Sequence, residues 1–504
     1  MRKTILLLAL WFVFSGGVFA AETEKKPNVL FIILEDTHWN VFGSYGNPIC
    51  QTPNIDKLAQ SGVLFERAYC QGSACNATRA SFINGLRPAT TRVWHNGQRI
   101  RDVLPEGIRG MPELFKEAGY TTIDIGKFYH TTDFAPKQTA VFDVIEHQSR
   151  PEGWQGPPPL LTFPPAQPDW NKKAKSRKKG EPQNAQARSH WYSDSYGDSG
   201  LEPEQEGDRR AARVAVAHLE KFAVEKTPDK KPFFLALSQG KPHTPYISPT
   251  KFATLYDPET IPAPPAPFET LKDFPYVVRA TVGGPDIFTQ SPSTPQEARE
   301  AIAAYYGCVT FVDENLGLVF DALEKTGLDK ETIVVLIGDH GVHLGDHNIW
   351  SKYTLLEGTH HAPLIVRVPG AKENGKRTKE LVEFVDLLPT FVDYCGLKDP
   401  GHLEGISFRP LLEKDVAIPW KKAAFLTDHD FGHAVRTPKY RYAEFGENAR
   451  WVADGLKAAL YDVEKDPEEV VNLINDPAYD TVKKELADLL HKGWKDALPP
   501  GYGE

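Results

Sequence analysis

The sequence predicts an α/β fold with parallel strands, and two observations carry that prediction. Four apolar runs of strand length are separated by helix-like segments, at residues 28–34, 121–126, 232–238 and 332–338. Apolar runs without alternation are typical of strands that are buried on both faces of a parallel sheet. Each run also ends close to polar residues, and open α/β sheets bind ligands beyond the carboxyl ends of their strands.

The polar residues that follow the four runs are of two chemical kinds. Two runs end in acidic pairs or an acid with a histidine, namely Glu35 with Asp36 and Asp339 with His340. The other two runs are followed by a lysine and a histidine, namely Lys127 with His130 and Lys241 with His243. One polar strand end is ordinary, but four with this chemistry indicate a shared catalytic site.

The remaining elements fit the same class of fold. We expect short strands at 63–65 and 364–370, and helices from Asp56 and over 111–119, 211–222, 295–323 and 382–395. Strand-like segments at 439–445 and 460–463 precede a final helix over 480–496. The proline-rich segments at 148–207 and 249–295 are expected to be surface loops. The basic run at 172–180 is either solvated or a lip that attracts sulfated chains.

The amino terminus has the pattern of a signal peptide over residues 1–20. Arg2 and Lys3 precede an apolar run that is shorter than the roughly 20 residues of a membrane span, and Val18-Phe19-Ala20 fits a cleavage site. We expect a secreted or periplasmic protein, lysosomal in an animal, with no membrane span. Cleavage of the signal peptide would remove the positive charges of Arg2 and Lys3 and change the net charge from −9 to −11. So acidic a protein is not suited to bind nucleic acid.

The five cysteines do not form a metal-type cluster. They are Cys50, Cys70, Cys75, Cys308 and Cys395. An odd count leaves one thiol over in a secreted protein, and we expect that thiol to be Cys75. A Cys50–Cys70 disulfide and free buried thiols remain equally open.

Cys75 opens the most informative stretch of the chain, residues 73–92. Ala80, Phe82, Ile83 and Leu86 recur at helical spacing, and Gly85 and Pro88 mark the end of the helix. Cys75 is therefore predicted at a helix N-terminus, where the thiol pKa is lowered. The alternative is a cysteine that only packs. A glycosylation sequon at Asn76-Ala77-Thr78 is interpreted as coincidental.

The strand ends are suited to a particular chemistry. Acidic residues from two strands offer oxygen ligands to calcium or magnesium, and His340 is a softer ligand. Lysines and histidines stabilise charge that develops on an anion, and a histidine can protonate a leaving oxygen.

Several motifs resemble those of the formylglycine-dependent sulfatases, in particular the branch that contains iduronate-2-sulfatase. Cys75-Asn76-Ala77-Thr78-Arg79, followed by Ser81 and Gly85, is similar to the family signature Cys-x-Pro-x-Arg. The other motifs are GKFYH at 126–130, GKPHTP at 240–245, DHGVHLGDHNIWSKY at 339–353 and LYDVEKDPEEVVNL at 460–473. Ala77 replaces the usual proline, and Glu35 replaces the usual aspartate.

The resemblance implies an alkaline-phosphatase-like fold, a large mixed sheet flanked by helices. Residues 21–428 would form the catalytic domain and 429–504 a subdomain with a short antiparallel sheet and a helix. A formylglycine-generating enzyme would convert Cys75 to formylglycine. One Ca²⁺ would be held by Glu35, Asp36, Cys75, Asp339 and His340. The other catalytic residues would be Arg79, Lys127 and Lys352, which neutralise sulfate oxygens, His130, which with Arg79 steadies the formylglycine, and His243, which protonates the leaving alcohol.

The substrate is expected to be a sulfated carbohydrate. Candidate substrate-binding residues follow the signature helix or precede Lys352: Trp94, His95, Arg99 and His347, with Arg101 and His343 as further candidates. The resemblance suggests a sulfated uronic acid, and sulfated algal polysaccharides are an alternative. A phosphatase or phosphodiesterase of the same fold and a non-catalytic protein that binds sulfated polysaccharides are the competing hypotheses.

Overall fold

A computed structural model describes residues 25–130, 141–146, 196–225, 227, 230–264, 293–350, 352–413, 419–428, 432–446 and 457–502. The expected signal peptide, the basic run at 172–180 and most of the two proline-rich segments lie outside these residues. No helix in the described part of the chain is long and apolar enough to cross a membrane.

The centre of the molecule is an eight-stranded mixed sheet with the order β11-β2-β10-β9-β1-β7-β4-β5. The four apolar runs form its middle: β1 (Asn28–Leu34), β4 (Thr121–Ile125), β7 (Phe233–Gln239) and β9 (Thr332–Gly338). The outer strands are β2 (Val63–Phe65), β5 (Val144–Glu146), β10 (Leu364–Arg367) and β11 (Arg377–Thr378). β10 is antiparallel to β9 and β2, whereas β9, β1, β7, β4 and β5 are parallel. The predicted mixed sheet is confirmed.

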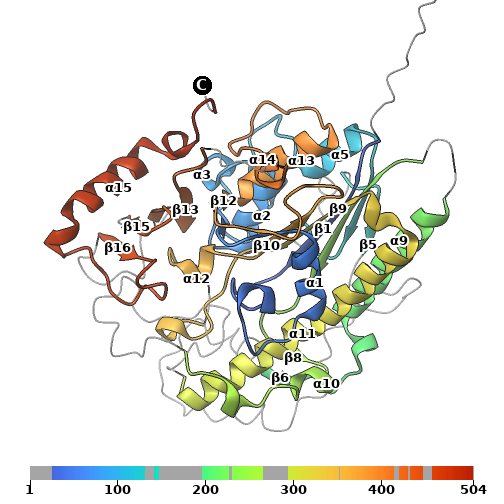
Figure 1. The fold of residues 1–504 in the computed structure, drawn as a ribbon, viewed down its shortest axis with the longest axis horizontal. Coiled ribbons are helices and arrows are strands. Elements are labelled where there is room, and N and C mark those ends of the chain that lie inside the picture. Colours follow the sequence, from blue (N-terminus) through green and yellow to red (C-terminus); the bar gives the residue numbers. More distant parts are fainter. Residues whose placement is uncertain are drawn as a thin grey trace, which may run out of the picture.

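Helices cover both faces of this sheet, as Figure 1 shows. On β1, Leu30 and Ile32 face the core under α1 (Pro53–Ser61), α9 (Gly207–Val224) and α11 (Pro295–Thr326). Phe31 and Ile33 face the core under α2 (Cys75–Asn84), α5 (Met111–Glu117) and α13 (Leu387–Cys395). Alternate side chains of a strand point to opposite faces, so an apolar run without alternation fills both cores.

The carboxyl-terminal part forms a small antiparallel sheet beside the main body (Figure 1). Its strands are β13 (Ala424–Asp428), β14 (Gly432–Arg436), β15 (Tyr440–Phe445) and β16 (Ala458–Asp462), and α15 (Asp480–Lys492) packs against it. This confirms the expected short sheet and helix. Its first strand lies within the range assigned to the catalytic domain.

The prediction of one helix over 382–395 is wrong for residues 382–386. Val382 and Glu383 form β12, which pairs with β3 (Ala68–Tyr69), and α13 begins only at Leu387 after a short 3₁₀ turn. The reason is tertiary: the buried Glu383 carboxylate accepts hydrogen bonds from Arg87 and from Lys421.

All five cysteines are free and buried. The Cys50–Cys70 disulfide that the sequence left open is therefore not formed. Burial raises the pKa of both thiols, which makes them unreactive packing residues.

Candidate active site

The carboxyl ends of β9, β1, β7 and β4 meet at one edge of the sheet, as their neighbouring positions require. Backbone hydrogen bonds continue past the strands, from Glu35 N–H to Gln239 O at 3.3 Å and from Asp339 N–H to Leu34 O at 2.9 Å. All four pairs of polar residues are thereby placed at the same edge, as the sequence predicts.

Two buried aspartates form the acidic part of the site. Asp339 Oδ1 accepts hydrogen bonds from the backbone N–H of Asp36 at 3.1 Å and of His340 at 3.0 Å. Asp36 has a left-handed backbone with φ of 48°, which is uncommon outside glycine. Tyr305, on α11, holds this turn by donating its hydroxyl proton to Asp36 O at 2.7 Å. No pattern in the sequence pointed to Tyr305.

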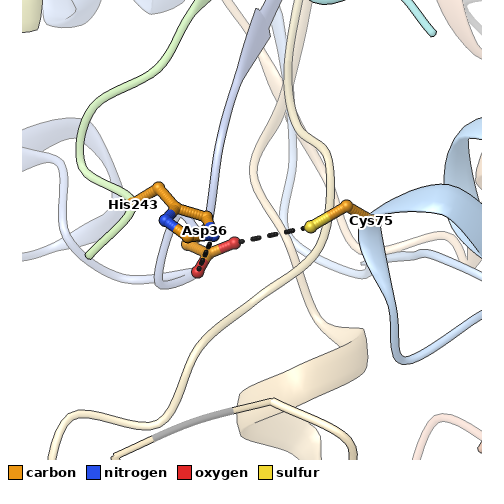
Figure 2. A group of neighbouring side chains, drawn as sticks. All are labelled: Asp36, Cys75 and His243. Carbon is orange, nitrogen blue, oxygen red and sulfur yellow. Dashed lines mark hydrogen bonds and ion pairs between the residues drawn. The ribbon is translucent and has the colours of Figure 1, made fainter. Parts of the chain in front are cut away.

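Cys75 is the first residue of α2 and is fully buried beside these aspartates. Figure 2 shows Asp36 between the Cys75 thiol and the His243 ring, with Cys75 Sγ 3.9 Å from Asp36 Oδ1. His340 Nε2 lies 3.1 Å from the sulfur. Burial raises the pKa of the thiol, but the charges of Lys352 and His340 outweigh it and the pKa is lowered. Cys50 and Cys70 differ, because there burial outweighs the neighbouring groups and the pKa of each thiol is raised.

The Lys352 ammonium group lies between the Cys75 thiol and the Asp36 carboxylate. Its Nζ is 2.7 and 2.8 Å from the two Asp36 carboxylate oxygens and 3.3 Å from Cys75 Sγ. Burial raises the pKa of Asp36, but the nearby His243, Lys352 and His340 charges lower it to about 2. The carboxylate is therefore ionised at neutral pH.

Arg79 lies one turn along α2 from Cys75 and is fully buried. Its Nη2 and Nε donate to Asp339 Oδ2 at 3.0 and 3.2 Å, and its Nη1 donates to the backbone oxygens of Lys127 and Phe128. Arg79 thus joins the ends of β9 and β4. This geometry favours a role in holding Asp339 over direct contact with an anion.

The end of β4 supplies a lysine and a neutral histidine. Lys127 Nζ is 2.6 Å from Glu35 Oε2, and Arg79 Nη2 is 3.8 Å from Glu35 Oε1. Burial and the charges of Lys127 and Arg79 lower the pKa of His130 to about 3. Its Nδ1 is buried without a hydrogen-bond partner among the described residues.

His243, after β7, approaches Asp36 from the other side, with 3.7 Å between His243 Nε2 and Asp36 Oδ2 (Figure 2). Its Nδ1 donates to Thr244 O at 2.7 Å. The preceding turn is held by Asp208 of α9, whose carboxylate accepts from the backbone N–H groups of Gly240 and Lys241, each at 2.8 Å. Sequence reasoning missed Asp208, because nothing in the local sequence links α9 to this turn.

Two groups of side chains have a geometry that could hold a metal ion. Ligand atoms of Asp36, Cys75 and His243 lie within 4.8 Å of one another, and so do those of Cys75, Asp339 and His340. His340 donates its Nδ1 proton to Gly341 O at 2.7 Å, which leaves Nε2 as a ligand atom. Carboxylate oxygens with one imidazole fit a divalent cation.

The predicted substrate-binding residues lie in two different parts of the structure, the stretch of chain that follows α2 and the segment that precedes Lys352. The loop 92–99 carries Trp94, His95 and Arg99 and is attached to α2 by hydrogen bonds from Asn76 to His95 O and Gln98 O. Asn76 is fully buried with both amide protons bonded, which supports the interpretation of its sequon as coincidental.

The histidines before Lys352 belong to a separate buried group. His343 bonds Asp346 through Nδ1 and Thr354 through Nε2, at 2.9 Å for the latter. His347 is buried, and burial is the main cause that lowers its pKa. Arg101 pairs with Glu113, at the start of α5. His343 and Arg101 are thus bonded to other side chains of the protein, and their role in substrate binding stays a prediction.

Comparisons with known proteins agree with this geometry. Residues 27–397 match the family model described as Sulfatase, and residues 345–496 match the model described as N-sulphoglucosamine sulphohydrolase, C-terminal. The first match covers the four central strands of the large sheet and the polar residues that follow them.

Two curated relatives span most of the chain. A protein named Sulfatase from Formosa agariphila is 32% identical over 93% of this chain and 87% of its own length. Iduronate 2-sulfatase of Homo sapiens is 27% identical over 91% of this chain and 92% of its own.

A solved structure bears out the fold. Phosphonate monoester hydrolase of Agrobacterium radiobacter matches with a TM-score of 0.70 and 23% identity, over 93% of this chain and 95% of that chain. At that identity the likeness speaks for the fold alone, whereas the family model and the Formosa relative identify the family. The chain belongs to the sulfatase family and is a sulfuric ester hydrolase.

Proposed function

We propose that this chain is a secreted sulfatase that removes sulfate from a sulfated sugar, with a uronic acid 2-O-sulfate as the first candidate. The observation that carries the proposal is the surroundings of Cys75 Sγ. It lies 3.1 Å from His340 Nε2, 3.3 Å from Lys352 Nζ and 3.9 Å from Asp36 Oδ1. A nucleophile position ringed by cations and metal-type ligands suits attack on an anionic ester.

Two groups would complete the site. Residue 75, converted to formylglycine by a formylglycine-generating enzyme, would supply the attacking hydroxyl as its hydrate. A Ca²⁺ ion, when bound, would polarise the sulfate oxygens. Asp36, Asp339, His340 and residue 75 would hold it, with Glu35 as the remaining predicted ligand.

The lysines would bind the sulfate group. Lys352 Nζ and Lys127 Nζ flank the site and are now paired with Asp36 and Glu35, respectively. With a cation on the carboxylates, their N–H groups would turn to the sulfate oxygens and offset charge that develops there. Arg79 would hold Asp339 and the β4 carbonyls in place, and His130 would steady residue 75.

His243 would protonate the departing sugar oxygen from Nε2. Its Nδ1 proton is committed to Thr244 O at 2.7 Å, so the proton to be transferred must be on Nε2, the atom that faces Asp36. A general acid contributes roughly 10²–10⁴-fold to such a step.

The substrate class rests on likeness to iduronate 2-sulfatase and on the exposed His95 and Arg99 of the 92–99 loop. An imidazole and a guanidinium next to the nucleophile helix suit a sugar that carries a carboxylate in addition to its sulfate.

The test is sulfate release by protein made with a formylglycine-generating enzyme. The panel contains a 2-O-sulfated uronate disaccharide, N-acetylglucosamine 6-sulfate, 4-nitrophenyl sulfate and 4-nitrophenyl phosphate, with the Cys75→Ala variant as the matched control. We expect turnover of sulfate esters that is highest on the uronate and lost in the variant. Preference for the phosphate ester would contradict the sulfatase reaction, and preference for the glucosamine would contradict the uronate.

A further inference from the structure

The side chain next to residue 75 has no role in the chemistry described above, yet it is fully buried and its amide nitrogen makes two hydrogen bonds, whereas its Oδ1 has no partner among the described residues. Asn76 is the second residue of α2 and is 0% exposed. Its Nδ2 donates one proton to His95 O at 3.0 Å and the other to Gln98 O at 2.7 Å. Both bonds leave the helix and end on the 92–99 loop.

The loop returns a bond to the helix. The Asn76 backbone N–H belongs to the first turn of α2, where N–H groups have no partner within the helix. It donates to Asn96 Oδ1 at 3.1 Å, and Ala74, the N-cap residue, makes no side-chain cap. Asn96 therefore caps the nucleophile helix, while Asn76 fixes the loop.

Hydrogen bonds from one side chain also connect the loop residues to one another. Gln98 Oε1 accepts from the backbone N–H groups of Trp94 at 2.6 Å and His95 at 3.1 Å, and Gln98 Nε2 donates to Arg92 O at 3.0 Å. His95 and Arg99 are exposed on this framework. Asn76 connects this loop to the helix that begins at Cys75.

A further contact extends the connection to the other side of the site. Asn96 Nδ2 donates to the hydroxyl of Tyr353 at 3.3 Å, and Tyr353 follows Lys352. The nucleophile helix, the 92–99 loop and the Lys352 segment are thus linked through Asn76 and Asn96.

We propose that Asn76 is a positioning residue that sets substrate specificity. It holds the 92–99 loop so that His95 and Arg99 meet a second anionic group of the substrate, a carboxylate or a neighbouring sulfate, while the sulfate ester reaches residue 75. This inference rests on the proposed function and deepens it. The substrate class is a sulfated sugar with an additional negative charge, and a simple aryl sulfate lacks the group that the loop would bind.

The experiment compares two variants that break the connection from opposite sides. Asn76→Ser removes both Nδ2 bonds from the helix. Gln98→Ala loosens the loop and lies outside the stretch that carries the maturation signature. Asn84→Ser is the matched control, because Asn84 is also buried on α2 but its amide nitrogen donates to Ala80 O of the same helix, at 2.8 Å, and not to the 92–99 loop. The converted fraction of each protein is measured by mass, and rates are expressed per converted molecule.

The readout is kcat and KM on a 2-O-sulfated uronate disaccharide and on 4-nitrophenyl sulfate. We expect Asn76→Ser and Gln98→Ala to lose kcat/KM on the disaccharide about tenfold more than on the aryl sulfate, mainly through KM, as expected for the loss of binding bonds. Asn84→Ser should change both substrates equally. Equal losses on the two substrates in both test variants, or no loss in either, would overturn the inference. Wild-type protein that is converted but releases no sulfate would instead refute the proposed function itself.

Discussion

Replacing Arg79 tests how the site is held together before any chemistry takes place. The guanidinium is buried and makes two hydrogen bonds to Asp339 Oδ2, at 3.0 and 3.2 Å, and two to backbone oxygens of the β4 end. Arg79→Lys keeps the positive charge but loses the paired N–H groups of the guanidinium, and a hydrogen bond to a charged group contributes about 1.5–3 kcal/mol. We therefore expect Arg79→Lys to lower the free energy of unfolding by about 3 kcal/mol. Arg79→Met leaves Asp339 buried without its partner, at a cost of about 3–5 kcal/mol.

These losses translate into small but measurable shifts of Tm. Unfolding entropy is roughly 2.1 cal/mol/K per residue, so about 1 kcal/mol corresponds to about 1 °C for the 504-residue chain. Arg79→Lys should lower Tm by about 3 °C and Arg79→Met by about 3–5 °C.

The assay is thermal unfolding of protein made without the formylglycine-generating enzyme, so that unequal maturation does not enter. Arg409→Lys is the control, since Arg409 forms an exposed pair with Asp393 at 3.1 Å and such pairs contribute at most about 1 kcal/mol. An Arg79→Met protein that unfolds within 1 °C of the control, roughly the size of the surface effect, would refute the reasoning.

Three further predictions follow from the same geometry. His243→Gln should lower kcat on a sugar sulfate by about 10²–10⁴-fold and much less on 4-nitrophenyl sulfate, whose leaving group needs no proton; equal losses would show that His243 is not the acid. Dialysis against EDTA should lower both activity and Tm, and Ca²⁺ should restore both, because an ion that binds the carboxylates of the folded protein stabilises the folded state; unchanged activity after chelation would contradict a metal site. Burial raises the pKa of Glu383, but Arg87 outweighs it and lowers the pKa from 4.5 to about 2. Between these two pKa values the native state binds fewer protons than the unfolded state, so the free energy of unfolding falls as the pH falls from about 4.5 to about 2. Urea unfolding between about pH 5 and pH 2 should show a flatter decline in Glu383→Gln, and an identical decline would refute the linkage.

The sheet, and the edge of the sheet at which the polar residues gather, could be predicted from the sequence because both depend on local patterns. The apolar runs mark strands that are buried on both faces, and parallel neighbours must end at the same edge. This brought Asp36, His243 and Asp339 together without any knowledge of the strand order.

The parts that the sequence did not predict depend on contacts between distant segments. The turn before His243 is fixed by Asp208, whose acceptors meet backbone N–H groups more than 30 residues away. The start of the 382–395 segment is extended because Glu383 is drawn to Arg87 and Lys421. Propensity alone carries no information about such pairings.

Arg79 illustrates how a motif and its contacts differ in content. Its motif predicts a cation that neutralises sulfate oxygens, which stays a prediction, and in the structure its donors bond Asp339 and two backbone oxygens. The residue type and spacing are those of the family signature, whereas the direction of the fork is set by the ends of β9 and β4.

The most direct test of the central claim measures the mass of the peptide that contains Cys75 together with sulfate release, across preparations made with different amounts of the formylglycine-generating enzyme. Conversion lowers the peptide mass by about 18 Da, because sulfur is replaced by oxygen and two hydrogens are lost. We predict that the rate of sulfate release rises in proportion to the converted fraction and extrapolates to zero for the unconverted thiol. Sulfate release that is independent of conversion, or full conversion without any release, would contradict the assignment of residue 75 as the nucleophile.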